Sequence, residues 1–287
     1  MTSAFEILKR MVKNIDSSGK KSIHDQKNNS TRRYQVKQRT GIVIPCYNEV
    51  MHLEAAQFVD FVRQNTDVHF HFVNDGSKDA TQQKIEEIAG SAGSNITFQS
   101  WRENRGKAEA VRAGVQALLS GSRFVYVAYW DADLSTPLDE ILRFIEAAES
   151  RPGIQFVCGS RIRRMGAKIE RFWYRHYFGR FFATAASLIL YLPIYDTQCG
   201  AKLIRAELAK LLFDRPFISR WLFDIELLAR MIEALGRNAV IEAVFELPLE
   251  KWQDKGGSKV RFSYLPKILI ELCRIRLTYR KCLDKKG

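Results

Sequence analysis

Residues 126–137 read YVAYWDADLSTP, and this stretch decides the fold of the chain. Its first five residues, 126–130, form an apolar and β-prone run, which predicts a buried central strand. Two carboxylates one residue apart, Asp131 and Asp133, follow the strand at once. Working outward from this point gives the organisation of the rest of the chain.

A helix is predicted to begin shortly after the two carboxylates. Thr136 suits the N-cap, Pro137 suits the first helical position, and Asp139 stands three residues after the cap, as in a capping box. The aspartates therefore lie in a strand-to-helix turn. In an open α/β sheet such turns lie at the carboxyl ends of the strands, where ligands bind.

Two hard oxygen donors on one turn can hold a metal ion. Asp131 and Asp133 suit Mg²⁺ or Mn²⁺, and they leave coordination positions for water and substrate phosphates. An ordinary solvated Asp-Ala-Asp turn is the alternative, and the motif taken alone does not decide between the two.

Strands and helices alternate on both sides of this stretch. Further strands are predicted in GIVIPCYN (41–48), VHFHFVNDGS (68–77), NITFQSW (95–101) and IQFVCGSR (154–161), with helical patterns between them. The alternation predicts an α/β fold with a parallel, doubly wound sheet and helices on both faces. The chain has no G-x-G-x-x-G after the first strand and no G-x-x-x-x-G-K-[ST], which excludes a Rossmann dinucleotide fingerprint and a P-loop.

Size and cysteine usage limit the class of protein. The 287 residues, 46% of them hydrophobic, suffice for one large domain with appendages. The chain has five cysteines, an odd number, and no two of them form a C-x-x-C motif. The sequence therefore indicates neither a disulfide framework nor a zinc site. A reducing, cytoplasmic setting is expected.

The net charge of +13 is concentrated in three zones. Residues 1–40 carry +7 and residues 251–287 carry +8, whereas residues 41–250 carry −2 in spite of a local +6 in residues 161–180. Such zones suit nucleic acid or an anionic membrane surface. We expect no nucleic acid partner, because no recognition module is present and strand-end carboxylates repel phosphate unless a metal intervenes.

The ends of the chain are predicted to contact a membrane without crossing it. Residues 1–40 read as a basic, partly disordered tail, and residues 263–287 as a basic amphipathic helix of interfacial type. Its apolar residues are Ile268, Leu269, Leu272, Ile275 and Leu283. The best apolar run, residues 181–192, is shorter than the roughly 20 residues that a spanning helix needs. We expect a peripheral protein on the cytoplasmic face of a membrane; packing of the helix on the core is the alternative.

Eight motifs follow one another between about residues 41 and 262: IPCYNE, VNDGSKDAT, NRGKAEAVRAG, DADLSTP, CGSR, DTQCGAKLIR, RWLFDIELL and GGSKVR. Together they resemble the family 2 glycosyltransferases of GT-A fold, and in particular the dolichyl-phosphate glucose and mannose synthases. The resemblance implies a Rossmann-like, mostly parallel sheet in a domain spanning residues 41–262. It also implies a metal-dependent, inverting transfer of a hexose from UDP-glucose or GDP-mannose to dolichyl or another polyprenyl phosphate. DTQCGAKLIR and RWLFDIELL are more similar to the glucose synthase pattern, which favours UDP-glucose.

The resemblance also assigns the donor site. The matching positions are Pro45, Tyr47, Glu49 and Asp75 for the nucleoside, Lys107 for the nucleotide, and Asp131 and Asp133 for the metal and diphosphate. Ser135 stands where mannose synthases often have a glutamine that also reaches the metal, so the set of metal ligands stays open at this position.

A phosphate acceptor needs a cationic cradle more than a base, because with a second pKa of about 6 it is already an oxyanion near neutral pH. Arg161, after the fifth strand, and Arg175, in the basic segment, suit this role, since a guanidinium binds phosphate oxygens bidentately. An ion pair on the surface is the alternative for both arginines.

Two further positions have alternative roles. Asp224 matches a catalytic base in related enzymes that glycosylate a hydroxyl, yet it also suits the N-cap of the following helix. With a lipid phosphate as acceptor, we expect it to organise the site. Ser258 and Lys259 are predicted to fold over the donor, and a solvated basic loop is the alternative.

Two other functions remain open at the level of the sequence. One is a family 2 transferase that glycosylates a hydroxyl of a glycan or protein. The other is a basic, non-enzymatic protein that binds nucleic acid or a membrane on a similar fold.

Overall fold

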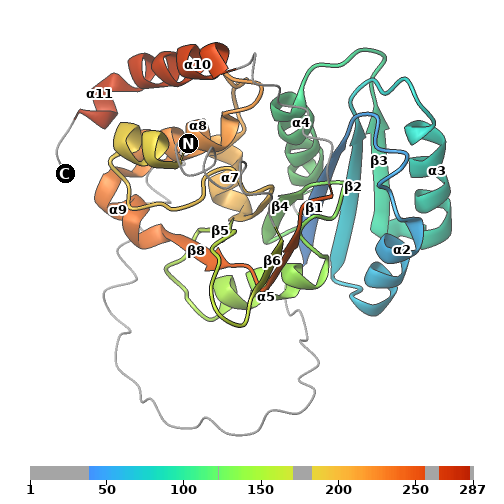
Figure 1. Cartoon of the computed structure of the whole chain (residues 1–287). Coiled ribbons are helices and arrows are strands. Elements are labelled where there is room, and N and C mark those ends of the chain that lie inside the picture. The colour runs from blue at the N-terminus through green and yellow to red at the C-terminus, as the bar shows by residue number, and fades with distance from the viewer. Residues whose placement is uncertain (1–38, 122, 171–182, 256–264, 285–287) are drawn as a thin grey trace, which may run out of the picture.

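Strand β4 (Tyr126–Trp130) lies in the middle of a seven-stranded sheet, and all five of its residues are buried. Figure 1 shows this sheet in the computed structural model, which describes residues 39–121, 123–170, 183–255 and 265–284. A strand that buries the side chains of both its faces must be covered on both sides. The predicted central strand is thus confirmed.

The strand order is β3-β2-β1-β4-β7-β5-β8. The other strands of this sheet are β1 (Thr40–Cys46), β2 (Val68–Asn74), β3 (Ile96–Ser100), β5 (Phe156–Ser160), β7 (Ala201–Arg205) and β8 (Val244–Pro248). A separate pair of short parallel strands is formed by β6 (Lys168–Glu170) and β9 (Lys251–Gln253).

All neighbouring strands of the large sheet are parallel except those that flank β7, which runs antiparallel to β4 and β5. The predicted, mostly parallel α/β sheet is confirmed, but the insertion of β7 between β4 and β5 was not predicted. Because β7 is antiparallel, Ala201 at its start pairs with Trp130 at the end of β4. Gly200 consequently lies beside Asp131. Because glycine has no side chain, the Asp131 carboxylate can occupy this space.

Helices cover both faces of the sheet (Figure 1). One face carries α2 (Ala55–Gln64), α3 (Thr81–Ala92) and α5 (Asp139–Glu149). The other carries α4 (Lys107–Ser120), α7 (Ala206–Leu212), α8 (Phe223–Leu235), α9 (Arg237–Ala243), α10 (Leu265–Thr278) and α11 (Arg280–Leu283). Successive residues of β1 alternate between the two cores, with Ile42 and Ile44 in one and Val43 in the other. This two-sided burial gives the sheet a rigid carboxyl edge.

The helix after the two carboxylates begins later than predicted. Helix α5 starts at Asp139, and Leu138, not Thr136, is its N-cap. The carbonyl of Thr136 instead accepts a hydrogen bond from Trp130 Nε1 at 2.8 Å. Leu134 adopts a left-handed conformation with φ of 51°, which a continuous helix would not allow. The extra turn keeps the aspartates close to the sheet.

The C-terminal segment is helical, as predicted, but most of its apolar face is used inside the protein. Ile268, Leu272, Ile275 and Leu283 are buried in the core of this face of the sheet, whereas Leu269 is exposed. The alternative of packing on the core therefore holds for these four residues. None of the described helices has the length and hydropathy to cross a bilayer. The predicted tail of residues 1–40 lies almost wholly outside the described residues.

Candidate active site

A pocket of about 620 Å³ opens at the carboxyl ends of β1, β2 and β4. Nine of the residues that the sequence assigns to the site line it: Pro45, Tyr47, Glu49, Asp75, Lys107, Asp131, Asp133, Arg161 and Asp224. Arg175, Ser258 and Lys259 lie outside the described residues. Side chains that are up to 179 positions apart in the sequence are thus brought to one cavity.

The pocket has two walls. The strand-end wall consists of Pro45, Tyr47, Glu49, Asp75, Lys107, Asp131 and Asp133, which lie at or just after the ends of strands or begin a helix. The C-terminal wall consists of Arg161, Gln198, Arg220, Trp221, Asp224 and Trp252. The two walls face the same space and are built in different ways.

The loops after β1 and β2 are tied together by Asn48. Its backbone N–H donates to Ser77 Oγ at 3.0 Å, and its side-chain oxygen accepts from the N–H of Lys78 at 2.8 Å. The N–H of Glu49 donates to Thr81 Oγ1 at 2.9 Å. These contacts fix the backbone that directly follows Tyr47, so the predicted nucleoside side of the pocket is preformed.

Asp75 holds the loop that starts α4. Its carboxylate accepts hydrogen bonds from Asn104 Nδ2 at 2.9 Å and from the N–H groups of Arg105 at 2.6 Å and Gly106 at 2.9 Å. Burial raises the pKa of Asp75, and the two backbone donors act against that rise. Asp75, which was predicted to contact the nucleoside, therefore uses most of its hydrogen-bond acceptor capacity to hold the loop that places Lys107.

Lys107 reaches across to the metal-binding candidates. Its Nζ lies 2.5 Å from Asp131 Oδ1. Burial favours the neutral amine, but the carboxylates of Asp131 and Asp224 outweigh it and raise the pKa of Lys107. A permanent positive charge therefore stands beside the carboxylate pair, where a diphosphate would be attracted.

The carboxylates of Asp131 and Asp133 repel each other. Burial and the charge of Asp131 raise the pKa of Asp133, while the N–H of Ser135 donates to Asp133 Oδ1 at 2.9 Å. A Cβ atom at Gly200 would lie 1.7 Å from Asp131 Oδ2, so only glycine leaves room for this carboxylate. The site is thus built to keep two acidic groups close together, an arrangement that a divalent cation relieves.

The residues fit a metal that is shared with a substrate. Among the described residues, no three His, Cys, Asp or Glu side chains converge into a complete protein cage for a metal ion. Mg²⁺ is usually bound by one or two carboxylates together with substrate phosphates and water. The pair Asp131 and Asp133 matches that mode of binding.

Asp224 is held in a buried ion pair. Its Oδ1 lies 2.8 Å from Lys202 Nζ and accepts a hydrogen bond from the Tyr129 hydroxyl. Burial opposes the charge on Lys202, but the carboxylate outweighs it and raises the pKa of the lysine. Asp224 lies in the first turn of α8, whose N-cap is Leu222, so the N-cap alternative is wrong. The ion pair favours the organising role for Asp224.

Arg161 lines the pocket, but another carboxylate already occupies its planar fork. Its Nε and one terminal nitrogen lie 2.7 and 2.8 Å from the two oxygens of Asp196. The backbone N–H of Asp196 in turn donates to Glu246. The alternative of an ion pair therefore describes Arg161 in this structure, with the difference that the pair is buried and not on the surface.

Sequence reasoning missed several residues of the C-terminal wall. Gln198 lies in DTQCGAKLIR and Trp221 in RWLFDIELL, so both motifs were noticed without these side chains being given a role. Arg220 is the first residue of RWLFDIELL and was likewise given no role, whereas Trp252 lies outside the motifs and had no signal of its own.

The comparisons with known proteins agree with this geometry. Residues 41–213 match the family described as Glycosyl transferase family 2. Over 253 residues the sequence is 32% identical to a dolichyl-phosphate beta-glucosyltransferase of Trichomonas vaginalis, spanning 84% of this chain and 72% of that protein. It is 29% identical to a dolichyl-phosphate beta-glucosyltransferase of Dictyostelium discoideum, over 83% of this chain and 74% of that protein. The chain belongs to glycosyl transferase family 2 and is a glycosyltransferase.

The fold is shared with solved structures of low sequence identity. One is glucosyl-3-phosphoglycerate synthase of Mycobacterium tuberculosis in complex with Mn²⁺ and UDP-glucose, with a TM-score of 0.60 and 16% identity over 91% of this chain and 86% of that chain. The GT-A fold that the motifs predicted is therefore confirmed.

Proposed function

We propose that this glycosyltransferase transfers glucose from UDP-glucose to dolichyl phosphate or another polyprenyl phosphate with the help of a divalent cation. One observation carries the proposal. A chain that is 32% identical to a dolichyl-phosphate beta-glucosyltransferase has, at the carboxyl ends of its strands, a pocket with paired carboxylates beside a half-buried lysine.

The pocket suits a nucleotide sugar and a metal. Its volume of about 620 Å³ lies in the range of small-molecule sites. A structural neighbour was solved with Mn²⁺ and UDP-glucose, which supports this choice of donor and of metal class. Asp131 and Asp133 would hold the cation, which when bound supplies a Lewis acid that neutralises charge on the departing diphosphate.

The protein's own residues prepare that step. Asp75 fixes the loop at Gly106, and this places Lys107 with its charge directed at the same point as the two aspartates. Such preorganised charges stabilise a developing negative charge without moving during the reaction. The strand-end wall therefore supplies the electrostatic part of the catalysis.

The contacts of Asp224 favour a phosphate acceptor over a hydroxyl acceptor. Its carboxylate is engaged by Lys202 Nζ at 2.8 Å and by the Tyr129 hydroxyl, so these contacts hold it in the wall of the pocket. A hydroxyl acceptor needs a base to take its proton, whereas a phosphate acceptor is already an oxyanion near pH 7. This wall therefore suits a lipid phosphate better than a hydroxyl.

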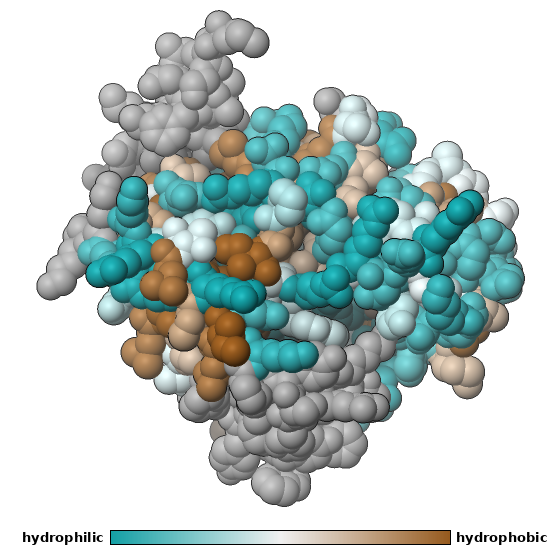
Figure 2. Space-filling model, turned by 90° about the horizontal axis from the view of Figure 1, so that it is seen from above, coloured by the Kyte–Doolittle hydropathy of each residue, from teal (hydrophilic) through white to brown (hydrophobic). Residues whose placement is uncertain are grey.

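Helix α10 offers a surface that suits the membrane in which such a lipid lies. Figure 2 views the molecule from the side of α10 and shows hydrophobic side chains gathered among hydrophilic ones there. The exposed apolar side chains of α10 are Leu269, Ile270 and Leu277, and Lys267 and Arg274 are exposed on the same helix. Apolar residues among cations are the composition of an interfacial helix.

The test is a transfer assay with the purified protein, Mg²⁺ or Mn²⁺, a short polyprenyl phosphate and a panel of UDP- and GDP-sugars. Mass spectrometry should detect lipid-linked glucose from UDP-glucose, and EDTA should abolish it. Lipid-linked mannose made from GDP-mannose alone would overturn the donor assignment. Glycosylation of a saccharide without lipid would overturn the acceptor assignment.

A further inference from the structure

The loop of residues 213–222 connects α7 to α8 and carries two side chains, Arg220 and Trp221, into the pocket. The stem of Arg220 covers Gly106, since a Cβ atom at that glycine would lie 3.1 Å from Arg220 Cδ. The carbonyl of Arg220 also accepts a hydrogen bond from the N–H of Ala108 at 3.4 Å. Arg220 thus lies over the start of α4, next to Lys107.

The two arginines of the pocket differ in what their guanidinium groups contact. Arg161 is neutralised by the buried carboxylate of Asp196 through two contacts of 2.7 and 2.8 Å. Within the described part of the chain, no hydrogen bond or ion pair engages the guanidinium of Arg220, and the side chain is exposed. The positive charge of Arg220 is near enough to Asp75 to oppose the rise that burial causes in the pKa of that carboxyl. Of the two, Arg220 has its fork available for a ligand.

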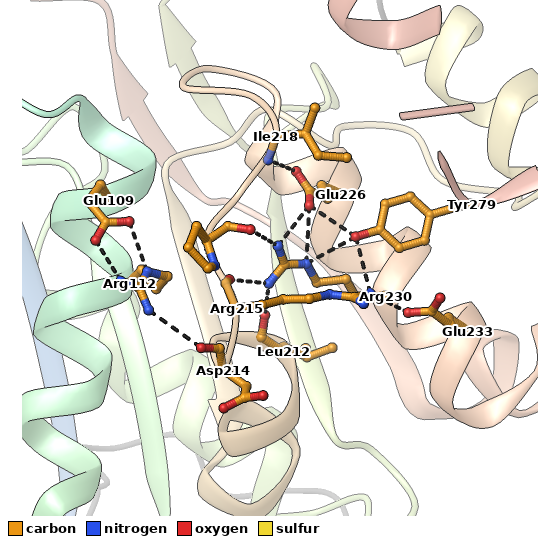
Figure 3. A network of polar contacts seen from close by, with 11 residues as sticks. Glu109, Arg112, Leu212, Asp214, Arg215, Ile218, Glu226, Arg230, Glu233 and Tyr279 are labelled. Atoms are coloured by element: carbon orange, nitrogen blue, oxygen red, sulfur yellow. Dashed lines mark hydrogen bonds and ion pairs between the residues drawn. The ribbon is translucent and has the colours of Figure 1, made fainter. Parts of the chain in front are cut away.

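A buried network anchors the loop that carries Arg220 (Figure 3). Glu226 and Arg230 on α8 are 0% and 3% exposed and pair at 2.8 Å. Arg230 donates to the carbonyls of Leu212, Arg215 and Pro216 at 2.6 to 2.7 Å. Glu226 accepts from the N–H of Ile218 at 2.8 Å. Because this charged pair forms hydrogen bonds with backbone groups at the start of the loop and within it, the pair fixes the course of the loop.

The C-terminal helices contribute to the same anchor. The Tyr279 hydroxyl, between α10 and α11, donates to Glu226 at 3.0 Å and lies 3.3 Å from Arg230 Nε (Figure 3). Ser219 Oγ, in the loop itself, donates to Glu271 on α10. The position of Arg220 is therefore set from the interior, while its guanidinium stays open to the pocket.

We propose that Arg220 binds a phosphate group of a substrate, and that the Glu226–Arg230 pair and Tyr279 position it. An unpaired guanidinium beside a fixed lysine is a site for phosphate oxygens, because it offers two parallel donors and a charge. The phosphate can belong to the nucleotide diphosphate or to the lipid acceptor, and in this the inference rests on the proposed function. Arg220 thereby offers the open guanidinium that was expected of Arg161.

Two measurements distinguish the sources of the phosphate. Calorimetric titration with UDP in the presence of Mn²⁺ reports the nucleotide without any turnover, and the KM for a short polyprenyl phosphate reports the acceptor. Arg220→Gln should raise the Kd for UDP or that KM at least about tenfold, since one charge-assisted hydrogen bond accounts for such a factor. Arg220→Lys should recover part of the loss because it keeps the charge.

The matched control is Lys210→Gln, which removes one positive charge from the surface of α7, the helix just before the loop. Lys210 pairs with Glu207 and does not line the pocket, so UDP affinity and acceptor KM should stay at wild-type values. If Arg220→Gln, with an unchanged melting temperature, behaves like Lys210→Gln in both measurements, the inference is wrong. If UDP binding depends on Arg220 but the wild-type protein makes no lipid-linked glucose, the proposed function fails and this inference stands.

Positioning is tested with a double-mutant cycle. Tyr279→Phe removes only the hydroxyl that contacts Glu226 and Arg230, and it should weaken UDP binding or acceptor use a fewfold in the wild-type background. In the Arg220→Gln background the same change should have no further effect. Equal effects in both backgrounds would show that Tyr279 acts independently of Arg220 and would overturn the positioning role.

Discussion

In the strand-end wall, the functional side chains are held by hydrogen bonds from the backbones of neighbouring loops, whereas in the C-terminal wall they are held by buried ion pairs. The carboxylate of Asp75 binds two N–H groups, and Asp133 binds one. On the other side, Arg161 pairs with Asp196 and Lys202 with Asp224.

The two kinds of support also differ in burial. The side chains of Lys107 and Asp131 are 27% and 36% exposed, against 1% and 7% for Lys202 and Asp224. An ion pair near solvent leaves a hydrated partner when one member is removed, but a buried pair leaves an uncompensated charge. Damage to the strand-end wall should therefore appear in turnover, and damage to the C-terminal wall in stability.

The largest expected effect is on Lys202. Lys202→Met leaves the Asp224 carboxylate buried without its cation, and we expect a loss of about 3–5 kcal/mol in the free energy of unfolding. Urea unfolding followed by circular dichroism measures this loss. Lys107→Met, the matched change in the strand-end wall, should cost less than about 1 kcal/mol.

The double variant Lys202→Met/Asp224→Leu removes both charges and should recover most of the stability that the single variant loses. A single variant as stable as the wild type would show that the buried pair does not support the C-terminal wall, and the contrast between the walls would then disappear.

The next effect concerns the two carboxylates of the strand-end wall. Asp131→Asn and Asp133→Asn keep the size of the side chain but remove a charge that faces the diphosphate, so kcat should fall by two orders of magnitude or more, roughly 3 kcal/mol of barrier. Thermal stability should change little. Asp139→Asn, an exposed acid just beyond the same turn, is the control and should keep full activity. Near-normal turnover in both Asn variants would refute the metal assignment.

The same contrast explains how much of the site the sequence could predict. In the strand-end wall most functional residues stand at or just after the end of an apolar run, as Asp131 follows the strand YVAYW. The pattern that forms the strand also places its end at the edge of the sheet, so local sequence is enough. The fold and this wall followed from motif order and strand periodicity.

The C-terminal wall depends on contacts that no local pattern records. Asp196 neutralises Arg161 from 35 positions away, and Lys202 stands inside the apolar strand β7 with its partner on another element. The insertion of β7 between β4 and β5 brings both pairs into place. Because strand order in a sheet is a tertiary property, sequence reasoning assigned Arg161 to the substrate and assigned no role to Arg220.

The smallest of the three effects is a pH dependence of stability that belongs to the C-terminal wall. Burial disfavours the charged form of Asp196, but the guanidinium of Arg161 outweighs it and lowers the pKa of this carboxyl from 3.8 to about 2. Between these two pH values the unfolded chain binds a proton that the folded protein does not. The pair therefore stabilises the fold fully above about pH 4, and this contribution is lost as the pH falls towards 2.

The difference of about two pKa units corresponds to roughly 2 kcal/mol at its largest. Asp196→Asn should be less stable than the wild type at pH 7, because it leaves the largely buried Arg161 without its carboxylate. Its free energy of unfolding should nevertheless fall less steeply between pH 4 and pH 2, by about that amount, in urea titrations at a series of pH values. The exposed acid Asp139 provides the control, since Asp139→Asn should leave the slope unchanged. Parallel curves for the wild type and Asp196→Asn would mean that Arg161 does not hold Asp196 in its charged form, and Arg161 would then be free to bind phosphate as the sequence predicted.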